Sequence, residues 1–322
     1  MKRYRIPQTD LEVSRLAYGC MQIGGSWSAE PMTDVEKTAA LAVVRTAYEQ
    51  GINFFDHADI YTRGKSEAVF AGALGEIPRD QIVIQSKCGI RFPGQPQPDD
   101  PQRFDFSYEH IINSVEGSLG RLGTDYLDIL LLHRPDALVE PEEVARAFDE
   151  LHQAGKVRYF GVSNHNVWQM ALLQKHVAQP LVVNQLEINL LHSYLINDGI
   201  LVNQTANTYA GATGILDYCR LHDIFVQAWS PVAGGRLFNP PAGAPEHIQK
   251  TAELVASMAA TKQSSKEAIV LAWLLRHPAG IQPIIGTTKP ERVIASCLAD
   301  GLSLSREEWY ALFIAGRGEA LP

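Results

Sequence analysis

The sequence has few cysteines and lacks a long apolar run. Four of its 322 residues are cysteine, and Cys20, Cys88, Cys219 and Cys297 lie far apart. They form no C-x-x-C pair of the kind that binds zinc or carries redox chemistry. No run of about 18 apolar residues occurs, and the basic segment 1–7 is not followed by the apolar stretch of a secretory signal. These absences predict a reduced, cytoplasmic protein that does not enter a membrane.

Positive charge is also scarce. The 28 Lys and Arg residues against 36 Asp and Glu give a formal net charge of −8, and the basic residues form no run. This argues against nucleic acid or an anionic membrane surface as a partner. Hydrophobic residues make up 46% of the chain, which is enough for a large core. The length suits either two ordinary domains or one large α/β barrel.

Short apolar segments alternate with amphipathic segments of helical period. The predicted strands are 15–19, 53–56, 82–87, 126–132, 157–163, 181–186, 224–229 and 281–286. The predicted helices are 35–50, 66–74, 108–122, 140–154, 167–176, 215–222, 266–276 and 291–298. Several strands are apolar almost throughout, which is typical of parallel strands buried on both faces.

Eight such units predict right-handed crossovers and closure into a (β/α)8 TIM barrel, with residues 1–322 as a single domain. An open doubly wound sheet is the alternative. Such a sheet usually has a G-x-G-x-x-G turn after its first strand, and residues 19–25 (GCMQIGG) do not match this pattern. The pattern therefore favours the barrel.

Some segments are additional to the eight units. Residues 247–260 and 305–316 predict two extra helices, and residues 90–106, 197–213 and 233–244 predict long loops. The loops after the third and seventh strands would lie at the C-terminal face of the barrel, where barrel enzymes carry their active sites.

Polar and aromatic residues stand where the apolar strands end. In chain order they are Asp56, Lys87, His133, Ser163-Asn164, Gln185 and Trp229-Ser230-Pro231. Each alone has a structural explanation: Asp56 could balance the charge of Lys87, and a lone histidine is usually structural. Because the carboxyl ends of barrel strands meet at one rim, however, these side chains should converge on one pocket.

The residues also form a chemically coherent set with Tyr61. A tyrosine hydroxyl has a pKa of about 10 and is a poor acid or base near neutral pH unless its phenolate is stabilised. The Lys87 ammonium is expected to lower the pKa of Tyr61, and Asp56 to keep that ammonium charged and oriented. His133 would orient a carbonyl oxygen or assist the proton transfer. The set suits proton donation to a carbonyl that receives a hydride.

The spacing Asp56-x-Ala58-x-x-Tyr61, followed by Lys87 and His133, resembles the Asp-Tyr-Lys-His tetrad of the aldo-keto reductase superfamily. Residues 155–164 (GKVRYFGVSN), 184–187 (NQLE), 228–231 (AWSP) and 283–289 (PIIGTTK) resemble further motifs of that superfamily, in the same order. The resemblance implies a metal-free barrel that binds NADPH at its C-terminal rim and reduces the carbonyl group of a small aldehyde or ketone. It makes Tyr61 the proton donor.

The resemblance also implies a set of cofactor-binding residues. They are Gly19, Met21, Ser163, Asn164, Gln185, Trp229, Ser230, Pro231, Val232, Gly234, Gly235, Gly286, Thr287, Lys289 and Arg292. Within this set, Ser163, Asn164 and Gln185 would bind the nicotinamide carboxamide, and Trp229 would stack on the nicotinamide ring. Residues 230–235 would wrap the pyrophosphate, since bare glycine backbone approaches phosphate oxygens closely. The 2′-phosphate of the adenosine would be surrounded by Gly286, Thr287, Lys289 and Arg292, and the two cations favour NADPH over NADH.

Four features depart from the superfamily's pattern. His57 stands where a small hydroxyl residue is common, and Ala295-Ser296 replaces a Glu-Asn pair that grips the adenine in many members. Arg134 replaces an aromatic residue next to His133 and would make the nearby pocket polar or attract an acidic substrate. Segment 197–213 is longer than usual. Loop aromatics such as Trp27, Phe92 and Tyr209 are candidate pocket walls.

Two other classes of function are open. In a metal-dependent barrel hydrolase, His57, Asp59 and His133 would approach a metal, although Lys87 would compete with it. A non-catalytic, nucleotide-sensing barrel of the same superfamily is the second. The sequence favours a monomer, leaves a small oligomer open, and does not identify the substrate.

Overall fold

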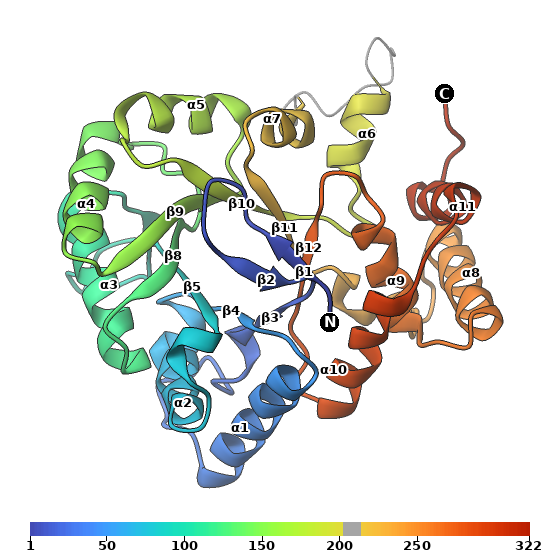
Figure 1. Cartoon of the computed structure of the whole chain (residues 1–322), viewed down its shortest axis with the longest axis horizontal. Coiled ribbons are helices and arrows are strands. Elements are labelled where there is room, and N and C mark those ends of the chain that lie inside the picture. The colour runs from blue at the N-terminus through green and yellow to red at the C-terminus, as the bar shows by residue number, and fades with distance from the viewer. Residues whose placement is uncertain (202–213) are drawn as a thin grey trace.

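Eight parallel strands close into a barrel in the order β10-β11-β12-β3-β4-β5-β8-β9 (Figure 1). The computed structural model describes residues 1–201 and 214–322. The barrel strands are β3 (Ala17–Gly19), β4 (Phe54–Asp56), β5 (Val83–Cys88), β8 (Leu127–Leu132), β9 (Val157–Ser163), β10 (Leu181–Glu187), β11 (Phe225–Trp229) and β12 (Gln282–Ile285). All eight predicted strands are present, so the predicted (β/α)8 barrel is confirmed.

Helices cover the outside of the barrel (Figure 1). The eight predicted for the repeat are α1 (Asp34–Glu49), α2 (Lys65–Leu74), α3 (Tyr108–Leu122), α4 (Pro141–Gln153), α5 (Val167–His176), α7 (Ile215–Leu221), α9 (Lys266–Leu275) and α10 (Pro290–Cys297). The two extra predicted helices are α8 (Glu246–Thr261) and α11 (Arg306–Arg317), which pack against each other. The sequence did not predict α6 (Tyr194–Ile200). The rest of the predicted loop 197–213, with Tyr209, lies outside the described residues.

Local signals set several helix boundaries. The Thr33 side chain accepts a hydrogen bond from the Glu36 backbone N–H, and the Glu36 side chain accepts one from Thr33 in return. Ser305 and Glu308 form the same reciprocal cap at the start of α11. Each cap satisfies backbone N–H groups that the first turn of a helix leaves unpaired.

A short hairpin closes the floor of the barrel. Strands β1 (Arg3–Arg5) and β2 (Glu12–Ser14) pair antiparallel, and Ile6 and Val13 join the buried cluster that contains Phe54 and Ile129 of the barrel interior. The sequence did not predict this hairpin, whose strands of three residues each lie outside the eight repeated units. A second hairpin, β6 (Ile90–Arg91) with β7 (Arg103–Phe104), lies within the predicted loop 90–106.

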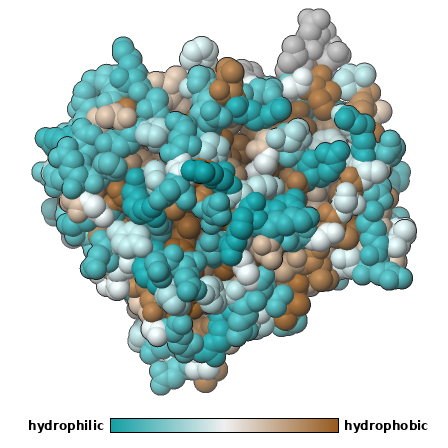
Figure 2. All heavy atoms as spheres, in the orientation of Figure 1, coloured by the Kyte–Doolittle hydropathy of each residue, from teal (hydrophilic) through white to brown (hydrophobic). Residues whose placement is uncertain are grey.

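The face of the molecule seen in Figure 2 is mostly hydrophilic, with apolar residues scattered between the polar ones. Within residues 1–201 and 214–322, no helix combines the length and the apolar character that crossing a membrane requires.

Candidate active site

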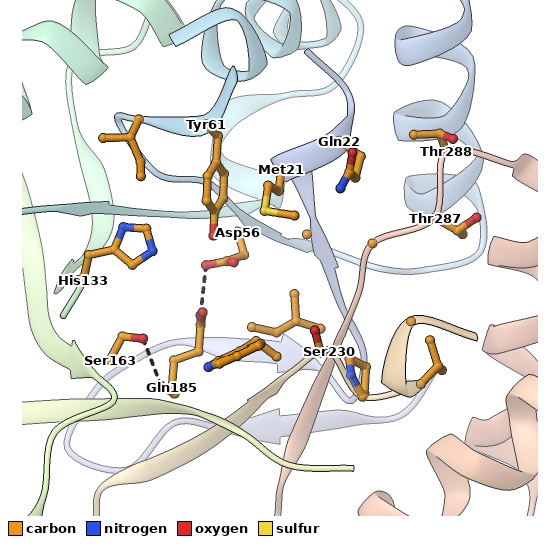
Figure 3. A pocket seen from close by; sticks show the side chains of 18 of the residues that line it. Met21, Gln22, Asp56, Tyr61, His133, Ser163, Gln185, Ser230, Thr287 and Thr288 are labelled. Carbon is orange, nitrogen blue, oxygen red and sulfur yellow. Dashed lines mark hydrogen bonds between the residues drawn. The ribbon is translucent and has the colours of Figure 1, made fainter. Parts of the chain in front are cut away.

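A cavity of about 680 Å³ opens at the carboxyl ends of the barrel strands (Figure 3). Every predicted catalytic and cofactor residue lines this cavity, with the exception of Lys87. Gln22 and Thr288 also line it, and the sequence analysis had not named either. The strand ends thus bring together residues that are up to 273 positions apart in the chain, from Gly19 to Arg292.

Lys87 lies behind Tyr61 and Asp56 rather than in the cavity. Its Nζ atom donates hydrogen bonds to Asp56 Oδ2 at 2.8 Å, to the His57 carbonyl oxygen at 2.8 Å and to Tyr61 Oη at 3.0 Å. An ammonium group has three hydrogens, so all of them are in use. The side chains of Lys87 and Asp56 are 0% and 4% exposed. The buried ion pair therefore fixes the phenol oxygen from below and leaves the phenol hydrogen for the cavity.

Burial has a larger effect on Tyr61 than Lys87 does. Removal of the phenol from water raises the pKa of Tyr61 above its ordinary value, although the Lys87 ammonium lowers it. Lys87 therefore lowers this pKa as expected, but burial outweighs its effect, so the net shift is upward. Burial also opposes the charge of Lys87, but Asp56 and Tyr61 raise its pKa, so the ammonium form persists at neutral pH.

His133 is an uncharged imidazole in this site. Burial, with the neighbouring Lys87 and Arg134 cations, holds the pKa of His133 well below its ordinary value. Its ring lies edge-on to the Tyr61 ring with the centroids 5.8 Å apart, and Figure 3 shows the two side by side. A neutral imidazole can donate one hydrogen bond but carries no extra proton to give. This favours an orienting role over proton donation.

Across the cavity, a chain of polar groups holds Trp229. The Trp229 Nε1–H donates to Asn164 Oδ1 at 3.0 Å, Asn164 Nδ2 donates to Ser163 Oγ at 2.8 Å, and Ser163 Oγ donates to the Gln185 carbonyl oxygen at 2.9 Å. On Trp229 the Arg134 guanidinium lies 5.5 Å from the ring centroid. These hydrogen bonds fix the plane of the Trp229 ring at the wall of the cavity.

The loop after β11 has the backbone shape of an anion cradle. Four of its residues, Ser230, Ala233, Gly234 and Gly235, have φ angles of 50°, 51°, 64° and 81°. Gly234 borders open space, with no atom within 4 Å of the position a Cβ would take. Turns that mix left- and right-handed residues make concave backbone that binds phosphate groups.

The far end of the cavity carries two cations. Lys289 precedes the first turn of α10, where the helix dipole adds positive potential. Arg292 Nε donates to Glu267 Oε1 at 3.2 Å, a neutralising contact that the sequence analysis did not foresee. Ser296 is buried and donates to the Arg292 carbonyl oxygen, so it does not replace the missing adenine-gripping side chains.

Two loop aromatics form the rim near Tyr61. Trp27 lines the cavity, and its ring lies 6.4 Å from that of Phe92 in an edge-on arrangement. Arg63 joins them, since its guanidinium lies 5.0 Å from the Phe92 ring centroid and its Nε donates to the Trp27 carbonyl oxygen at 3.0 Å. Trp27 is therefore part of the cavity wall, whereas Phe92 does not line the cavity and contacts Trp27 and Arg63 instead.

The arrangement does not suit a metal hydrolase. His57 is fully buried against Phe70, with the ring centroids 4.5 Å apart, and neither His57 nor Asp59 lines the cavity. Over residues 1–201 and 214–322, no three His, Cys, Asp or Glu side chains gather in a way that could hold a metal ion.

Comparison with known proteins gives the family. A profile of the Aldo/keto reductase family matches residues 15–313. The chain is 35% identical over 325 residues to an uncharacterized oxidoreductase, YcsN, of Bacillus subtilis, covering 100% of both proteins. It is 35% identical to a 6-dehydroglucose reductase of Agrobacterium fabrum, covering 98% of both. Among solved structures, a glycerol dehydrogenase from Gluconobacter oxydans superposes with a TM-score of 0.81 at 26% identity, over 98% of this chain and 94% of that one. The chain therefore belongs to the aldo-keto reductase family.

Proposed function

We propose that this protein reduces aldehyde or ketone carbonyls to alcohols with NADPH, and that Tyr61 supplies the proton. The observation that carries the proposal is the Tyr61 hydroxyl, which faces the cavity while Lys87 Nζ holds its oxygen at 3.0 Å. Family membership supports the oxidoreductase chemistry, and the polar strand ends of β9 and β10 fit a nicotinamide carboxamide. NADPH, when bound, supplies the hydride.

Tyr61 acts as an acid in this scheme. Its raised pKa keeps the phenol protonated near neutral pH, so a proton is available for the carbonyl oxygen while the carbonyl carbon takes up the hydride. The buried Lys87 ammonium then stabilises the phenolate that remains, and Tyr61 regains its proton from solvent. The neutral His133 donates a hydrogen bond that orients the carbonyl oxygen.

The preference for NADPH rests on the far end of the cavity. A 2′-phosphate carries two negative charges and needs charged partners. Lys289 and Arg292 provide them, and Glu267 offsets part of the charge of Arg292. We expect Lys289 to contribute the larger share.

For the substrate, we propose small polar carbonyl compounds. Two relatives, from Agrobacterium fabrum and Novosphingobium aromaticivorans, are 6-dehydroglucose reductases, which makes sugar aldehydes the first compounds to test. Arg134 lines the cavity and pairs with no carboxylate among the described residues, so a substrate with an acidic group is the second choice. The four thiols are free, which fits a cytoplasmic location.

The test is steady-state NADPH oxidation with neutral and acidic aldehydes, beside Tyr61→Phe as a matched variant. We expect the variant to turn over roughly 10²–10⁴-fold more slowly, the range for loss of a general acid, while nucleotide fluorescence shows unchanged binding. Equal turnover in the two proteins would reject Tyr61 as the proton donor. A wild-type protein that binds NADPH and reduces no carbonyl compound would instead fit the nucleotide-sensing alternative.

A further inference from the structure

Four glutamine side chains lie in the interior of the barrel, and one of them, Gln185, also lines the cavity. Gln85 of β5, Gln185 of β10, Gln227 of β11 and Gln282 of β12 are each at most 2% exposed. The interior of such a barrel is usually filled by branched apolar side chains. A buried amide costs free energy unless its polar atoms are hydrogen-bonded, so four together need a reason.

The lower part of this set forms a chain that starts at the barrel floor. Gln282 Nε2 donates to the Ser14 carbonyl oxygen at 2.7 Å, and Gln227 Nε2 donates to Gln282 Oε1 at 2.9 Å. Ser14 is the last residue of the hairpin strand β2. The chain is thus anchored in backbone that does not belong to the cavity.

The upper part converges on Asp56. Gln85 Nε2 and Gln185 Nε2 both donate to Gln227 Oε1, at 2.9 and 3.1 Å. The same two nitrogens donate to Asp56 Oδ1, at 2.6 and 3.1 Å. Figure 3 shows the contact between Gln185 and Asp56. One oxygen of Asp56 therefore receives two amide donors, while the other receives Lys87.

Only one orientation of the amides satisfies this chain. Its two ends, the Ser14 carbonyl and the Asp56 carboxylate, are hydrogen-bond acceptors. Gln85 and Gln185 must therefore turn their NH₂ groups to Asp56 and Gln227, since a flipped amide would place one oxygen against another. Gln227 fixes both of them through a single oxygen atom.

We propose that Gln85, Gln227 and Gln282 are positioning residues, which hold Asp56 so that Lys87 stays on the Tyr61 oxygen and so tune the acidity of Tyr61. The inference rests on the proposed role of Tyr61 as the proton donor. The proposal extends the site into the barrel as far as Gln282, which three successive hydrogen bonds connect to Asp56.

The chain has a consequence for Gln185 as well. Both hydrogens of its NH₂ group point to Asp56 and Gln227, so this cavity-lining side chain can offer only its Oε1 atom to a ligand. That oxygen accepts a hydrogen bond from an N–H group, such as that of a nicotinamide carboxamide. It gains nothing from an analogue in which a methyl ketone replaces the carboxamide.

The expected effect on Tyr61 has a definite sign. The groups whose charge acts on its phenol are Lys87, Asp56 and Cys20, with the neutral His133 beside it. Asp56 is the anionic partner of Lys87 in the buried ion pair. With fewer amide donors, more of its negative charge acts on Lys87 and Tyr61, so the pKa of Tyr61 rises.

The test compares Gln85→Met, Gln227→Met and Gln282→Met, which lie one, two and three links from Asp56. All three glutamines are fully buried, so a purely structural role predicts similar losses of stability. We expect the pH of half-maximal alcohol oxidation to rise by about one pH unit in Gln85→Met, less in Gln227→Met and least in Gln282→Met. The turnover number kcat should fall in the same order, with KM little changed.

Ile129→Val is the matched control, because Ile129 is fully buried in the same interior and makes none of these hydrogen bonds. It should lower the melting temperature and leave the pH profile unchanged. The proposal would be overturned if the pH profile of alcohol oxidation shifted equally in the three glutamine variants and in Ile129→Val, or if it shifted in none of them.

Two measurements need no turnover. In NMR spectra of protein with labelled tyrosine Cζ atoms, the Tyr61 signal, assigned through Tyr61→Phe, should move in Gln85→Met and stay in place in Ile129→Val. By fluorescence, Gln227→Met should weaken binding of NADP⁺ more than binding of its acetylpyridine analogue. A static Tyr61 signal in folded Gln85→Met refutes the chain. If Gln85→Met does not fold, equal losses of binding for both nucleotides in Gln227→Met refute it. If the wild-type protein reduces no carbonyl compound, the proposed function is wrong. The chain of glutamines can still be tested, because neither the NMR measurement nor the nucleotide-binding measurement needs turnover.

Discussion

At the scale of single residues, the site depends on charges that are held out of water. Lys87 and Asp56 form a buried pair, and removal of one member leaves the other without its partner, which is far more costly than the loss of a surface pair. Their effects on Tyr61 should therefore be linked rather than independent.

Lys87→Met should remove nearly as much carbonyl reduction as Tyr61→Phe, because the phenolate would lose the ammonium that donates to it. Asp56→Asn should be milder, since the ammonium remains. The double variant should be little worse than Lys87→Met, as expected for residues that act as one unit. The measurement is kcat/KM for Tyr61→Phe, for the two single variants of the pair and for the double variant, each relative to wild type. Additive losses in the double variant would contradict a coupled pair.

Burial also makes one acidic residue sensitive to pH. Removal from water, with Glu67 close by, raises the pKa of Asp59 to about 7, and Asp59 Oδ1 has no hydrogen-bond partner among the described residues. In the unfolded chain Asp59 loses its proton near its ordinary pKa of about 3.9. The folded state therefore binds more protons between these values, and its stability falls as pH rises from about 4 to about 7.

Asp59→Asn should remove this slope. We expect the variant to be more stable than the wild type above pH 7 by up to about 4 kcal/mol, from a pKa difference of about three pH units. Urea unfolding at several pH values measures this. The same dependence on pH in both proteins would assign the slope to other groups.

At the scale of elements, the cofactor end is built from the loop after β11 and the start of α10. Double substitution Lys289→Ala and Arg292→Ala should weaken the binding of NADPH more than that of NADH. The expected difference is about 1 kcal/mol of binding free energy for each side chain, after allowance for solvent screening. Nucleotide fluorescence measures both affinities. The control for net charge is double substitution Lys37→Ala and Lys250→Ala, which removes two exposed lysines paired with Asp34 and Glu246. Equal weakening of the two nucleotides would place the preference elsewhere.

At the scale of the whole molecule, the residues that pack the floor of the barrel lie at the opposite end of the strands from the candidate active site. The hairpin of β1 and β2 packs its apolar residues into the floor, while the cavity opens at the opposite end of the strands. Ile6→Ala should cost about 2–5 kcal/mol of unfolding free energy, because Ile6 is fully buried. Urea unfolding and kcat/KM together test this, and a large change in kcat/KM with little loss of stability would contradict it.

The sequence alone predicted the eight strands and the helices between them, because apolar runs and amphipathic periods are local patterns. It also indicated the rim residues, since parallel strands in a barrel must end at one face. Asp56, Tyr61 and His133 could be predicted to meet for that reason. The sequence analysis missed the hairpin strands and α6, which lie outside the regular alternation of strands and helices on which the prediction was based.

Other features exist only after the barrel closes. The net rise of the Tyr61 pKa depends on how much water is excluded, and no spacing in the sequence reports that quantity. Likewise, Glu267 reaches Arg292 from a different helix, and four glutamines on four strands meet in one chain of hydrogen bonds. The sequence determined which groups stand at the rim, and the tertiary structure decided their charges and orientations, because burial and long-range hydrogen bonds are properties of the assembled interior.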